Sequence, residues 1–252
     1  SAAEREEQRV VDAVRSALEA DRFKLAYQTI ASLEGDTRRH FDVLIRMINE
    51  QGEEVHASDF VGIAEKAGLM RLIDRWVVQH AVDSIVSRKN RQDGSMLFLK
   101  LSEDTLRDSE AFLAWLHELL KGRRLGEDEV CFELQEIALQ NHIRKAKSLT
   151  RKLRDSGVSV AIEHFGLSIN SAQLLEHLPV NFLKFHSSYT QNFGEKDIQK
   201  KMSGFIEQSK QRRIRTIVSH VEDANVMARM WQLGVNFIQG YHIQEPEVVL
   251  LS

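Results

Sequence analysis

The spacing of apolar and polar residues changes along the chain, and each change marks an expected element. In residues 1–22 four apolar residues recur at helical spacing among many charges: Val10, Val11, Val14 and Leu18. This pattern predicts an amphipathic helix with one face to bury. Two extended runs follow at residues 23–30 and 41–48, and the turn-rich segment between them predicts a hairpin or an equivalent antiparallel excursion.

Further along the chain, helical segments alternate with short apolar strands. The expected helices are residues 59–67, 70–87, 106–121, 137–155, 171–178, 197–211 and 224–232. The expected strands are residues 96–101, 130–134, 158–162, 181–185, 214–218 and 237–238. This alternation predicts an α/β fold with a parallel sheet covered by helices, and the total strand number favours a closed barrel over an open sheet. Active sites of such barrels lie at the C-terminal ends of the strands.

The length of 252 residues fits one barrel domain with a short extension. No low-complexity or Pro/Ser-rich linker divides the chain. We therefore expect a linker helix over residues 1–22 and a single domain over residues 23–252. Because the chain begins at Ser1 without a Met, we interpret it as part of a longer protein whose upstream domains connect through this helix; a processed start is the alternative.

The composition narrows the classes of partner. A formal net charge of -3 with 28% charged residues provides no basic field for long nucleic acid and no polybasic membrane signal. The single cysteine, Cys131, excludes a disulfide framework and a CxxC metal site. No segment approaches the roughly 20 consecutive apolar residues of a membrane span. We expect a cytoplasmic domain that binds neither nucleic acid nor membrane.

Polar residues gather where the expected strands end. On a barrel these ends converge on one mouth, so their side chains are expected to share one site, although any single one of them could simply face solvent. They are Asp42, Arg46, Lys100, Glu133, Glu136, Glu163, His164, Lys184, His186, His220, Glu222 and Gln239.

Many of these residues fall in motifs whose order and spacing resemble the EAL domain family. Asp42-Val43-Leu44 stands where the family has Glu-Ala-Leu, and Leu44-Ile45-Arg46 matches its LLR segment. Further matches are residues 27–30 (YQTI) with YQPI, 100–102 (KLS) with NLS, 133–136 (ELQE) with E-x-T-E, 163–166 (EHFG) with DDFG, Lys184 with the lysine of LKID, 219–222 (SHVE) with AEGVE, and 239–241 with QGY. The resemblance covers about residues 23–246.

The resemblance implies a modified (β/α)8 barrel of the TIM type with an antiparallel first strand, and it implies Mg²⁺-dependent hydrolysis of cyclic di-GMP. This sequence departs from the family at its metal ligands and at positions beside them. Lys100 replaces an asparagine, His164 and His186 each replace an aspartate, and the shortened segment at His220 lacks one glutamate. The positions that we interpret as degenerate catalytic ones are Lys100, Glu133, Glu163, His164, Lys184, His186 and His220.

Mg²⁺ requires six oxygen ligands in near-octahedral geometry, and two-metal hydrolysis requires bridging carboxylates. An ammonium group at Lys100 would repel a metal ion and pair with the remaining acids. We therefore expect no catalytic residue and no metal cofactor, and we expect Lys100 to contact Glu133 or Glu163.

The family's ligand contacts are better preserved than its metal ligands. The resemblance implies a cyclic di-GMP site formed by Gln28, Asp42, Val43, Leu44, Arg46, Glu222, Gln239 and Pro246. Arg46 can hold a phosphate through two hydrogen bonds, while Gln28, Glu222 and Gln239 can bind guanine edges or ribose hydroxyls. The sequence therefore predicts a binding domain rather than an enzyme.

The combination of degenerate motifs, with a lysine in the NLS position and the SHVED segment, resembles the FimX group of type IV pilus regulators. That resemblance implies a cyclic di-GMP receptor that controls pilus biogenesis and twitching motility through a PilZ-domain adaptor. For the adaptor surface we consider four apolar residues of 171–178 and the following strand: Leu174, Leu175, Phe182 and Phe185. Strand addition to an unpaired edge in the N-terminal hairpin region is the alternative.

Several other interpretations remain open. The domain could be a weak phosphodiesterase, a hydrolase with zinc or iron on His164, His186 and His220, or an interaction domain that binds no nucleotide. Arg46 could be a salt-bridge partner of Glu34 or Asp36. Glu222 could be an acid favoured by a helix N-terminus, and Lys184 could balance the charge of Glu163.

Overall fold

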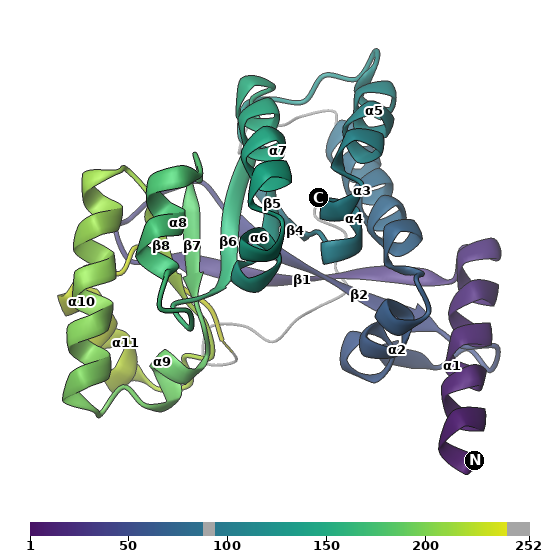
Figure 1. The fold of residues 1–252 in the computed structure, drawn as a ribbon, viewed down its shortest axis with the longest axis horizontal. Coiled ribbons are helices and arrows are strands. Elements are labelled where there is room, and N and C mark those ends of the chain that lie inside the picture. Colours follow the sequence, from purple (N-terminus) through teal and green to yellow (C-terminus); the bar gives the residue numbers. More distant parts are fainter. Residues whose placement is uncertain (88–93, 241–252) are drawn as a thin grey trace.

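Eight strands close into a barrel in the computed structural model, which describes residues 1–87 and 94–240 (Figure 1). The ring order is β1, β9, β8, β7, β6, β5, β4 and β2, and β2 pairs again with β1. The ring strands are β1 (Phe23–Ser32), β2 (His40–Ile48), β4 (Met96–Lys100), β5 (Val130–Gln135), β6 (Ser159–Phe165), β7 (Phe182–Phe185), β8 (Arg215–Val218) and β9 (Phe237–Ile238). A ninth strand, β3 (Glu54–His56), pairs with β2 outside the ring.

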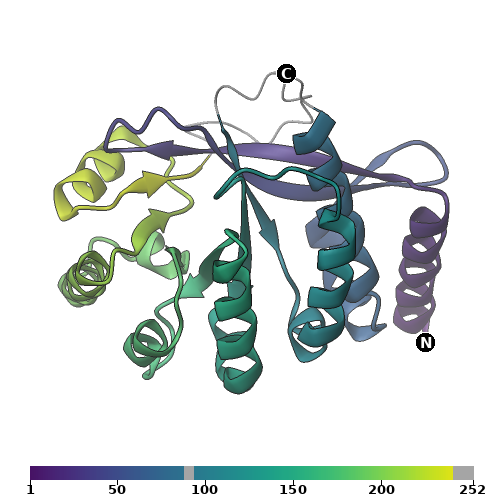
Figure 2. The same cartoon turned by 90° about the horizontal axis from the view of Figure 1, so that it is seen from above.

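Helices follow the outside of the curved sheet in chain order, as the view from above shows (Figure 2). They are α1 (Ala2–Glu19), the 3₁₀ turn η1 (Ala57–Asp59), α2 (Val61–Lys66), α3 (Met70–Ser87), α4 (Glu103–Arg107), α5 (Ser109–Leu120), α6 (Glu136–Asn141), α7 (Ile143–Asp155), α8 (Ser171–His177), α9 (Ser188–Gln191), α10 (Lys196–Gln211) and α11 (Ala224–Leu233). No helix among the described residues is long and apolar enough to cross a bilayer.

The first strand runs against both of its neighbours. β1 pairs antiparallel with β2, with Gln28 opposite Asp42, and antiparallel with β9, with Ala31 opposite Ile238. The other ladders of the ring are parallel. The expected antiparallel start and the barrel fold are therefore confirmed.

Two apolar layers result from the alternation of side chains along each strand. In β4, Leu97 and Leu99 point outward and pack among the helices, whereas Met96 and Phe98 point into the barrel. The inner layer consists of Ile30, Met96, Phe98, Cys131, Ala161, Phe182, Ile217 and Phe237. Strands buried on both faces need near-continuous apolar runs, which explains why β4 and β5 show so little polar alternation.

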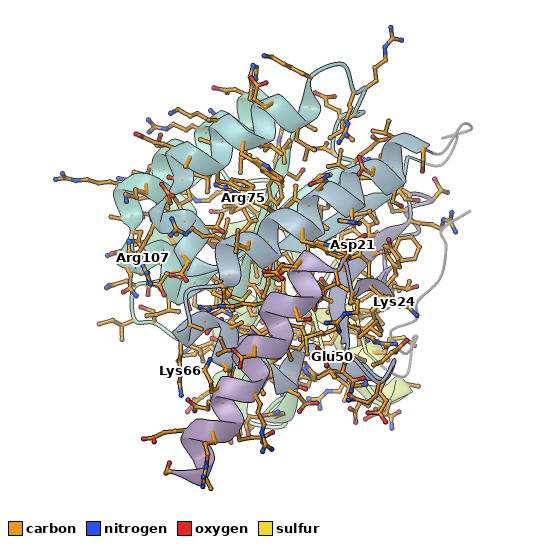
Figure 3. All side chains as sticks on the ribbon, turned by 90° about the vertical axis from the view of Figure 1, so that its right-hand side faces the viewer. Asp21, Lys24, Glu50, Lys66, Arg75 and Arg107 are labelled. Carbon is orange, nitrogen blue, oxygen red and sulfur yellow. The ribbon has the colours of Figure 1, made fainter. Side chains whose placement is uncertain are left out.

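The N-terminal helix is docked on the barrel rather than detached from it (Figure 3). Val14 and Ala17 of α1 are fully buried. Asp21, just beyond α1, has a φ of 54° and accepts a 2.6 Å hydrogen bond from Trp76 Nε1 of α3. A capping box at Ser1 and Glu4 begins the helix.

Some expected bounds differ from the structure. β6 continues to Phe165, so Glu163 and His164 belong to the strand rather than to the loop after it. The expected helices 106–121 and 137–155 are each divided, because Asp108 and His142 leave the helical conformation between two segments. The short elements β3 and α9 were not expected, because three or four residues carry no readable periodicity.

The proposed apolar adaptor surface was wrong. Leu174, Leu175, Phe182 and Phe185 are all buried in the core, so they stabilise the barrel and offer no surface to a partner. The alternative edge exists as β3, which within the described residues pairs only with β2.

Candidate functional site

Along each strand, the inward-facing side chains are apolar inside the barrel, and the last one, at the open end, is charged or polar. In β4 the inward series runs from Phe98 to Lys100, and in β7 from Phe182 to Lys184. The same two-residue step leads from Cys131 to Glu133, from Ala161 to Glu163 and from Phe237 to Gln239. In β1, which runs the other way, it leads from Ile30 to Gln28. The alternation that fills the barrel core therefore also builds a polar mouth.

These side chains surround a hollow of about 310 Å³. Its lining residues are Gln28, Asp42, Leu44, Lys100, Glu163, His164, Lys184, Ser187, Ser219, His220, Glu222, Gln239 and Gly240. Most of the strand-end residues singled out in the sequence are thus brought together on this one wall. Glu133 lies below them, in direct contact with Lys184.

Two lysines and three acids form one connected ion cluster at the floor of the hollow. Lys184 Nζ lies 3.1 Å from Asp42 Oδ2 and 3.0 Å from Glu133 Oε2. Lys100 Nζ lies 2.9 Å from Glu163 Oε1 and 3.7 Å from Asp42 Oδ2. The expected Lys100–Glu163 contact is confirmed. Lys184 makes its direct ion pairs with Asp42 and Glu133, and its charge also acts on Glu163 from a greater distance, as the alternative interpretation of Lys184 held.

Burial and charge give the three acids different protonation behaviour. Burial would raise the pKa of Asp42 and Glu163, but the charges of Lys100 and Lys184 outweigh it and hold both pKa values below the usual range. Burial raises the pKa of Glu133 to about 8, and the neighbouring Asp42 charge adds to the rise. Near neutral pH the cluster therefore holds two carboxylates, two ammonium groups and one neutral acid, which balances its charge.

Two amides complete the floor. Gln239 Nε2 donates hydrogen bonds to Asp42 Oδ2 at 2.9 Å and to Gln28 Oε1 at 2.6 Å. Gln28 and Asp42 also face each other across the β1–β2 ladder. These bonds join Gln239, at the end of β9, to Gln28 on β1 and Asp42 on β2. They therefore connect the strands at which the barrel closes.

The three histidines are not arranged as a metal site. Among the described residues no group of three or more His, Cys, Asp or Glu side chains is placed to hold a metal ion, so the zinc or iron interpretation was wrong. The His186 ring accepts a 3.1 Å hydrogen bond from Ser188 N at the start of α9. The His164 and His186 rings meet edge to face with centroids 5.6 Å apart, and His220 contacts Ser219.

Other expected contact residues occupy different places. Arg46 lies beyond the hollow, where its Nη1 is 3.1 Å from Glu54 Oε2 on β3, so neither Glu34 nor Asp36 is its partner. Val43 is buried in the outer apolar layer. Glu222 lines the hollow, whereas Asp223 is the N-cap of α11. Pro246 and Tyr241 lie outside the described residues.

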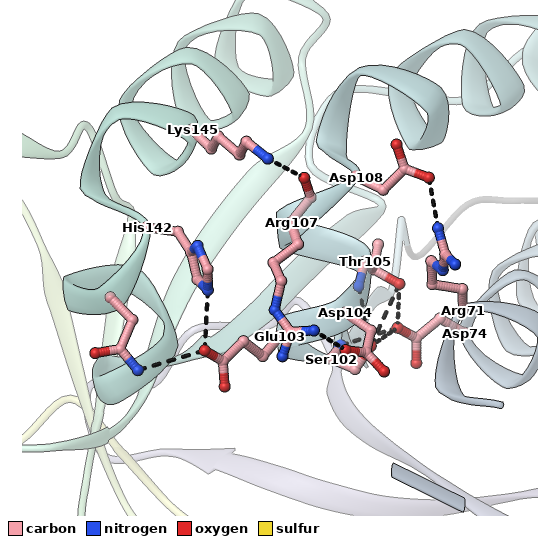
Figure 4. Close-up of polar contacts among 11 residues, drawn as sticks. Arg71, Asp74, Ser102, Glu103, Asp104, Thr105, Arg107, Asp108, His142 and Lys145 are labelled. Carbon is pink, nitrogen blue, oxygen red and sulfur yellow. Dashed lines mark hydrogen bonds and ion pairs between the residues drawn. The ribbon is translucent and has the colours of Figure 1, made fainter. Parts of the chain in front are cut away.

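A second hollow of about 240 Å³ adjoins the first and shares Lys100 and Glu163 with it. Its wall includes Asp74, which the sequence did not single out (Figure 4). Asp74 Oδ2 accepts hydrogen bonds from Ser102 N at 2.9 Å, Ser102 Oγ at 2.7 Å and Thr105 Oγ1 at 2.5 Å. Burial raises the pKa of Asp74 to about 6 despite these bonds. The carboxyl thus fixes the segment that directly follows Lys100.

The turn after β6 is held in a fixed shape by another buried acid, Glu136. Its Oε2 accepts hydrogen bonds from Gly166 N at 3.2 Å and Leu167 N at 3.1 Å. Tyr189 Oη donates a 2.7 Å bond to Gly166 O. Two residues here have left-handed backbone conformations: His164 near the end of β6, with φ 52°, and Gly166 in the turn, with φ 103°. Because this turn follows Glu163 closely in the chain, Glu136 and Tyr189 help to fix the position of the site residues on β6.

Gly240 is required by a close approach of the backbone. A Cβ at this position would lie 2.2 Å from Val221 O. Val221 N also donates a 3.1 Å hydrogen bond to Gln239 O. The segment that carries His220 and Glu222 therefore packs directly against the end of the last strand.

A family model described as the EAL domain matches residues 11–246. This chain belongs to the EAL domain family. The crystal structure of the FimX EAL domain from Pseudomonas aeruginosa bound to c-di-GMP superposes with a TM-score of 0.88 at 34% identity, and covers 96% of this chain and 97% of that one. The Xanthomonas citri FimX EAL domain in complex with c-diGMP has a TM-score of 0.90 at 25% identity, and covers 100% and 98%.

Curated relatives of this EAL domain include enzymes. Cyclic di-GMP phosphodiesterase PdeF of Escherichia coli is 22% identical over 96% of this chain and 32% of its own length. Cyclic di-GMP phosphodiesterase PdeB of Shewanella oneidensis is 27% identical over 93% of this chain and 28% of its own length. The chain thus spans about a third of the length of such relatives.

The raised pKa of Glu133 makes stability depend on pH. In the folded protein Glu133 retains its proton up to a pH of about 8, whereas in the unfolded chain it releases the proton near the ordinary glutamate pKa of 4.5. Stability should therefore fall as the pH rises, by about 2 kcal/mol between pH 6 and pH 8 for this group alone. Glu133→Gln, which is neutral throughout, should flatten the curve of unfolding free energy against pH in urea titrations. Parallel curves for the parent and the variant would contradict the assignment.

Gly166→Ala should destabilise the domain, because φ is 103° and the new Cβ would lie 2.5 Å from Tyr189 Oη. We expect a loss of about 1–3 kcal/mol. Gly204→Ala is a matched control in α10, where no atom lies within 4 Å of the new Cβ, and should raise stability by about 0.5–1 kcal/mol. Thermal and urea unfolding measure both. Equal effects of the two variants would show that the Gly166 turn is not held as described.

Proposed function

We propose that this EAL domain is a non-catalytic receptor for cyclic di-GMP in the cytoplasm. The observation that carries the proposal is the position of Lys100, whose ammonium lies between Glu163 and Asp42. These acids are the ones that the family resemblance assigns to Mg²⁺. A second ammonium, Lys184, bridges Asp42 and Glu133.

The residues present do not fit a divalent metal. A metal ion among these acids would lie within a few ångströms of two positive charges, and repulsion between unit charges at 4 Å costs about 4 kcal/mol even at an effective dielectric constant of 20. The lysines already form ion pairs with the acids that would bind it. Glu133 is also held largely protonated, and a neutral acid is a poor ligand for a hard cation.

The same mouth retains groups suited to a bound nucleotide. Gln28 and Gln239 supply amides at the floor, and Glu222 supplies an exposed carboxylate at the rim. Carboxylates and amides can pair with the N–H groups of guanine or with ribose hydroxyls. Lys100, with 45% of its side chain exposed, contributes positive charge toward an anionic ligand. The FimX EAL structures named above contain this ligand, which supports the assignment.

Arg46 is the proposed phosphate contact. Its ion pair with Glu54 holds one side of the guanidinium beyond the hollow, and the side chain stays 16% exposed. A planar guanidinium can pair with a carboxylate on one side and hold a phosphate with another pair of N–H groups. β3 therefore contributes to the proposed phosphate contact, because it carries the Glu54 carboxylate that pairs with Arg46.

Calorimetric titration with cyclic di-GMP tests the proposed pose. Arg46→Ala should weaken affinity about 10- to 150-fold, because a hydrogen bond to a charged group contributes about 1.5–3 kcal/mol. Lys66→Ala, which removes a surface cation paired with Glu7 of α1, is the control and should bind as the parent does. Unchanged affinity of the Arg46 variant would exclude the pose. Accumulation of linear pGpG when the parent is incubated with Mg²⁺ would exclude the non-catalytic assignment.

The output of such a receptor must be a protein contact. Without turnover, a ligand can act only by changing the equilibrium of another binding event. We propose a PilZ-domain adaptor in a type IV pilus system that drives twitching motility, following the FimX resemblance. Upstream domains of the same polypeptide are further proposed partners, since curated relatives are about three times the length that this chain matches.

Sedimentation of this domain with a PilZ adaptor from the same pilus system should show a complex whose affinity differs with and without cyclic di-GMP. The Arg46→Ala variant, at ligand concentrations too low to saturate it, should behave like the ligand-free domain. If no complex forms in either condition, the receptor has another output. If the complex forms equally in both conditions, cyclic di-GMP does not control it.

A further inference from the structure

A basic hollow lies at the end of the barrel opposite the mouth. It has a volume of about 300 Å³ and sits where β7 and β8 begin, between the C-terminal ends of α7, α8 and α10. Its lining residues are Arg151, Arg154, Leu175, Glu176, His177, Leu178, Pro179, Val180, Arg212 and Ile214. Three arginines thus face one carboxylate around a small concave surface.

The hollow carries more positive charge than the acidic residues around it neutralise. Arg154 Nε lies 3.8 Å from Asp155, and within the described residues Arg151 and Arg212 have no ion pair. α7 carries six Lys and Arg residues and a single Asp. The whole chain, in contrast, has a net charge of -3. Positive charge is therefore concentrated on a part of an otherwise acidic protein.

Compensation of helix dipoles accounts for only part of this charge. Cations near a helix C-terminus are favourable by about 0.3–1 kcal/mol each, and α7, α8 and α10 all end here. One cation for each helix end would meet that need. α7 alone places Arg151, Lys152 and Arg154 in its last five residues, and Arg212 and Arg213 follow α10 directly.

We propose that this hollow binds an acidic segment of a partner protein, with carboxylates held by Arg151, Arg154 and Arg212. Its floor is formed by buried apolar residues such as Leu178 and Ile214, which can accept the methylene groups of Glu or Asp side chains. Guanidinium groups bind carboxylates through paired hydrogen bonds. Charge complementarity therefore identifies the occupant as a run of Asp and Glu residues.

Two other anionic partners fit the hollow less well. No Phe, Tyr or Trp side chain lines it and His177 supplies the one ring, so it offers no platform on which successive bases of a single-stranded nucleic acid could stack. None of the large exposed apolar side chains of the described residues lines it either, so it lacks the groups that anchor a basic surface in a lipid bilayer.

The test uses the 252-residue chain and a fluorescein-labelled peptide of eight glutamates, with fluorescence anisotropy at low and at physiological salt. Arg151→Gln/Arg154→Gln/Arg212→Gln should weaken binding about tenfold or more, since paired charged hydrogen bonds are lost. Lys196→Gln/Lys200→Gln/Lys201→Gln removes the same charge from the other end of α10 and should change affinity less than about threefold. Circular dichroism and the cyclic di-GMP titration, which reports on the opposite end of the barrel, check that both variants are folded.

Four outcomes would overturn the proposal. Failure of the peptide to bind at millimolar concentration would exclude an acidic segment. Equal losses in both triple variants would indicate a diffuse field rather than a built site. Tighter binding of a labelled oligothymidine, lost in the same arginine variant, would identify nucleic acid as the partner. Arginine-dependent sedimentation with phosphatidylserine vesicles, without peptide binding, would identify a membrane.

Discussion

Charge balance inside a closed barrel is the constraint on which the rest of the site depends. A buried carboxylate without a partner loses its hydration and costs several kcal/mol. Here Asp42, Glu133 and Glu163 come from three different strands, and the ammonium groups of Lys100 and Lys184 lie between them. The cluster holds β2, β4, β5, β6 and β7 together at the mouth, and Gln239 extends it to the last strand. The rim residues proposed to bind the ligand are positioned by the strands that this cluster holds together.

The parts of the site that follow from strand alternation could be predicted from the sequence. A charged residue two positions after an inward-facing apolar one, as in Phe182 and Lys184, points to the mouth whatever the neighbouring strands do. That Lys100 would contact Glu133 or Glu163 followed from charge alone, since a base and acids at the same mouth attract each other, and the structure places it on Glu163 of β6, one strand beyond its neighbour β5.

The choice among several possible partners could not be predicted. Lys184 meets Asp42 and Glu133 rather than Glu163, because barrel closure brings β2 opposite β7, and this depends on the ring as a whole. The partner of Arg46 was missed because Glu54 lies on a strand of three residues with no periodic signal. Asp74, a buried acid that holds the segment after Lys100, shows no pattern in one sequence, and Glu136 was singled out as a strand-end residue without its backbone bonds to Gly166 and Leu167.

The ion cluster also has an evolutionary consequence. Near neutral pH four of its five groups are charged and neutralise one another, so replacing Asp42, Glu163, Lys100 or Lys184 alone leaves an uncompensated charge in a buried place. An exchange of Lys100 for a neutral residue would leave the Glu163 carboxylate without its direct partner, and an exchange of Lys184 would remove one of the two ammonium groups beside Asp42. A second, compensating substitution is therefore needed to restore the charge balance after such a change. Single substitutions are therefore easier to tolerate at the exposed rim of the mouth than among the buried charged groups of its floor, where one change calls for another.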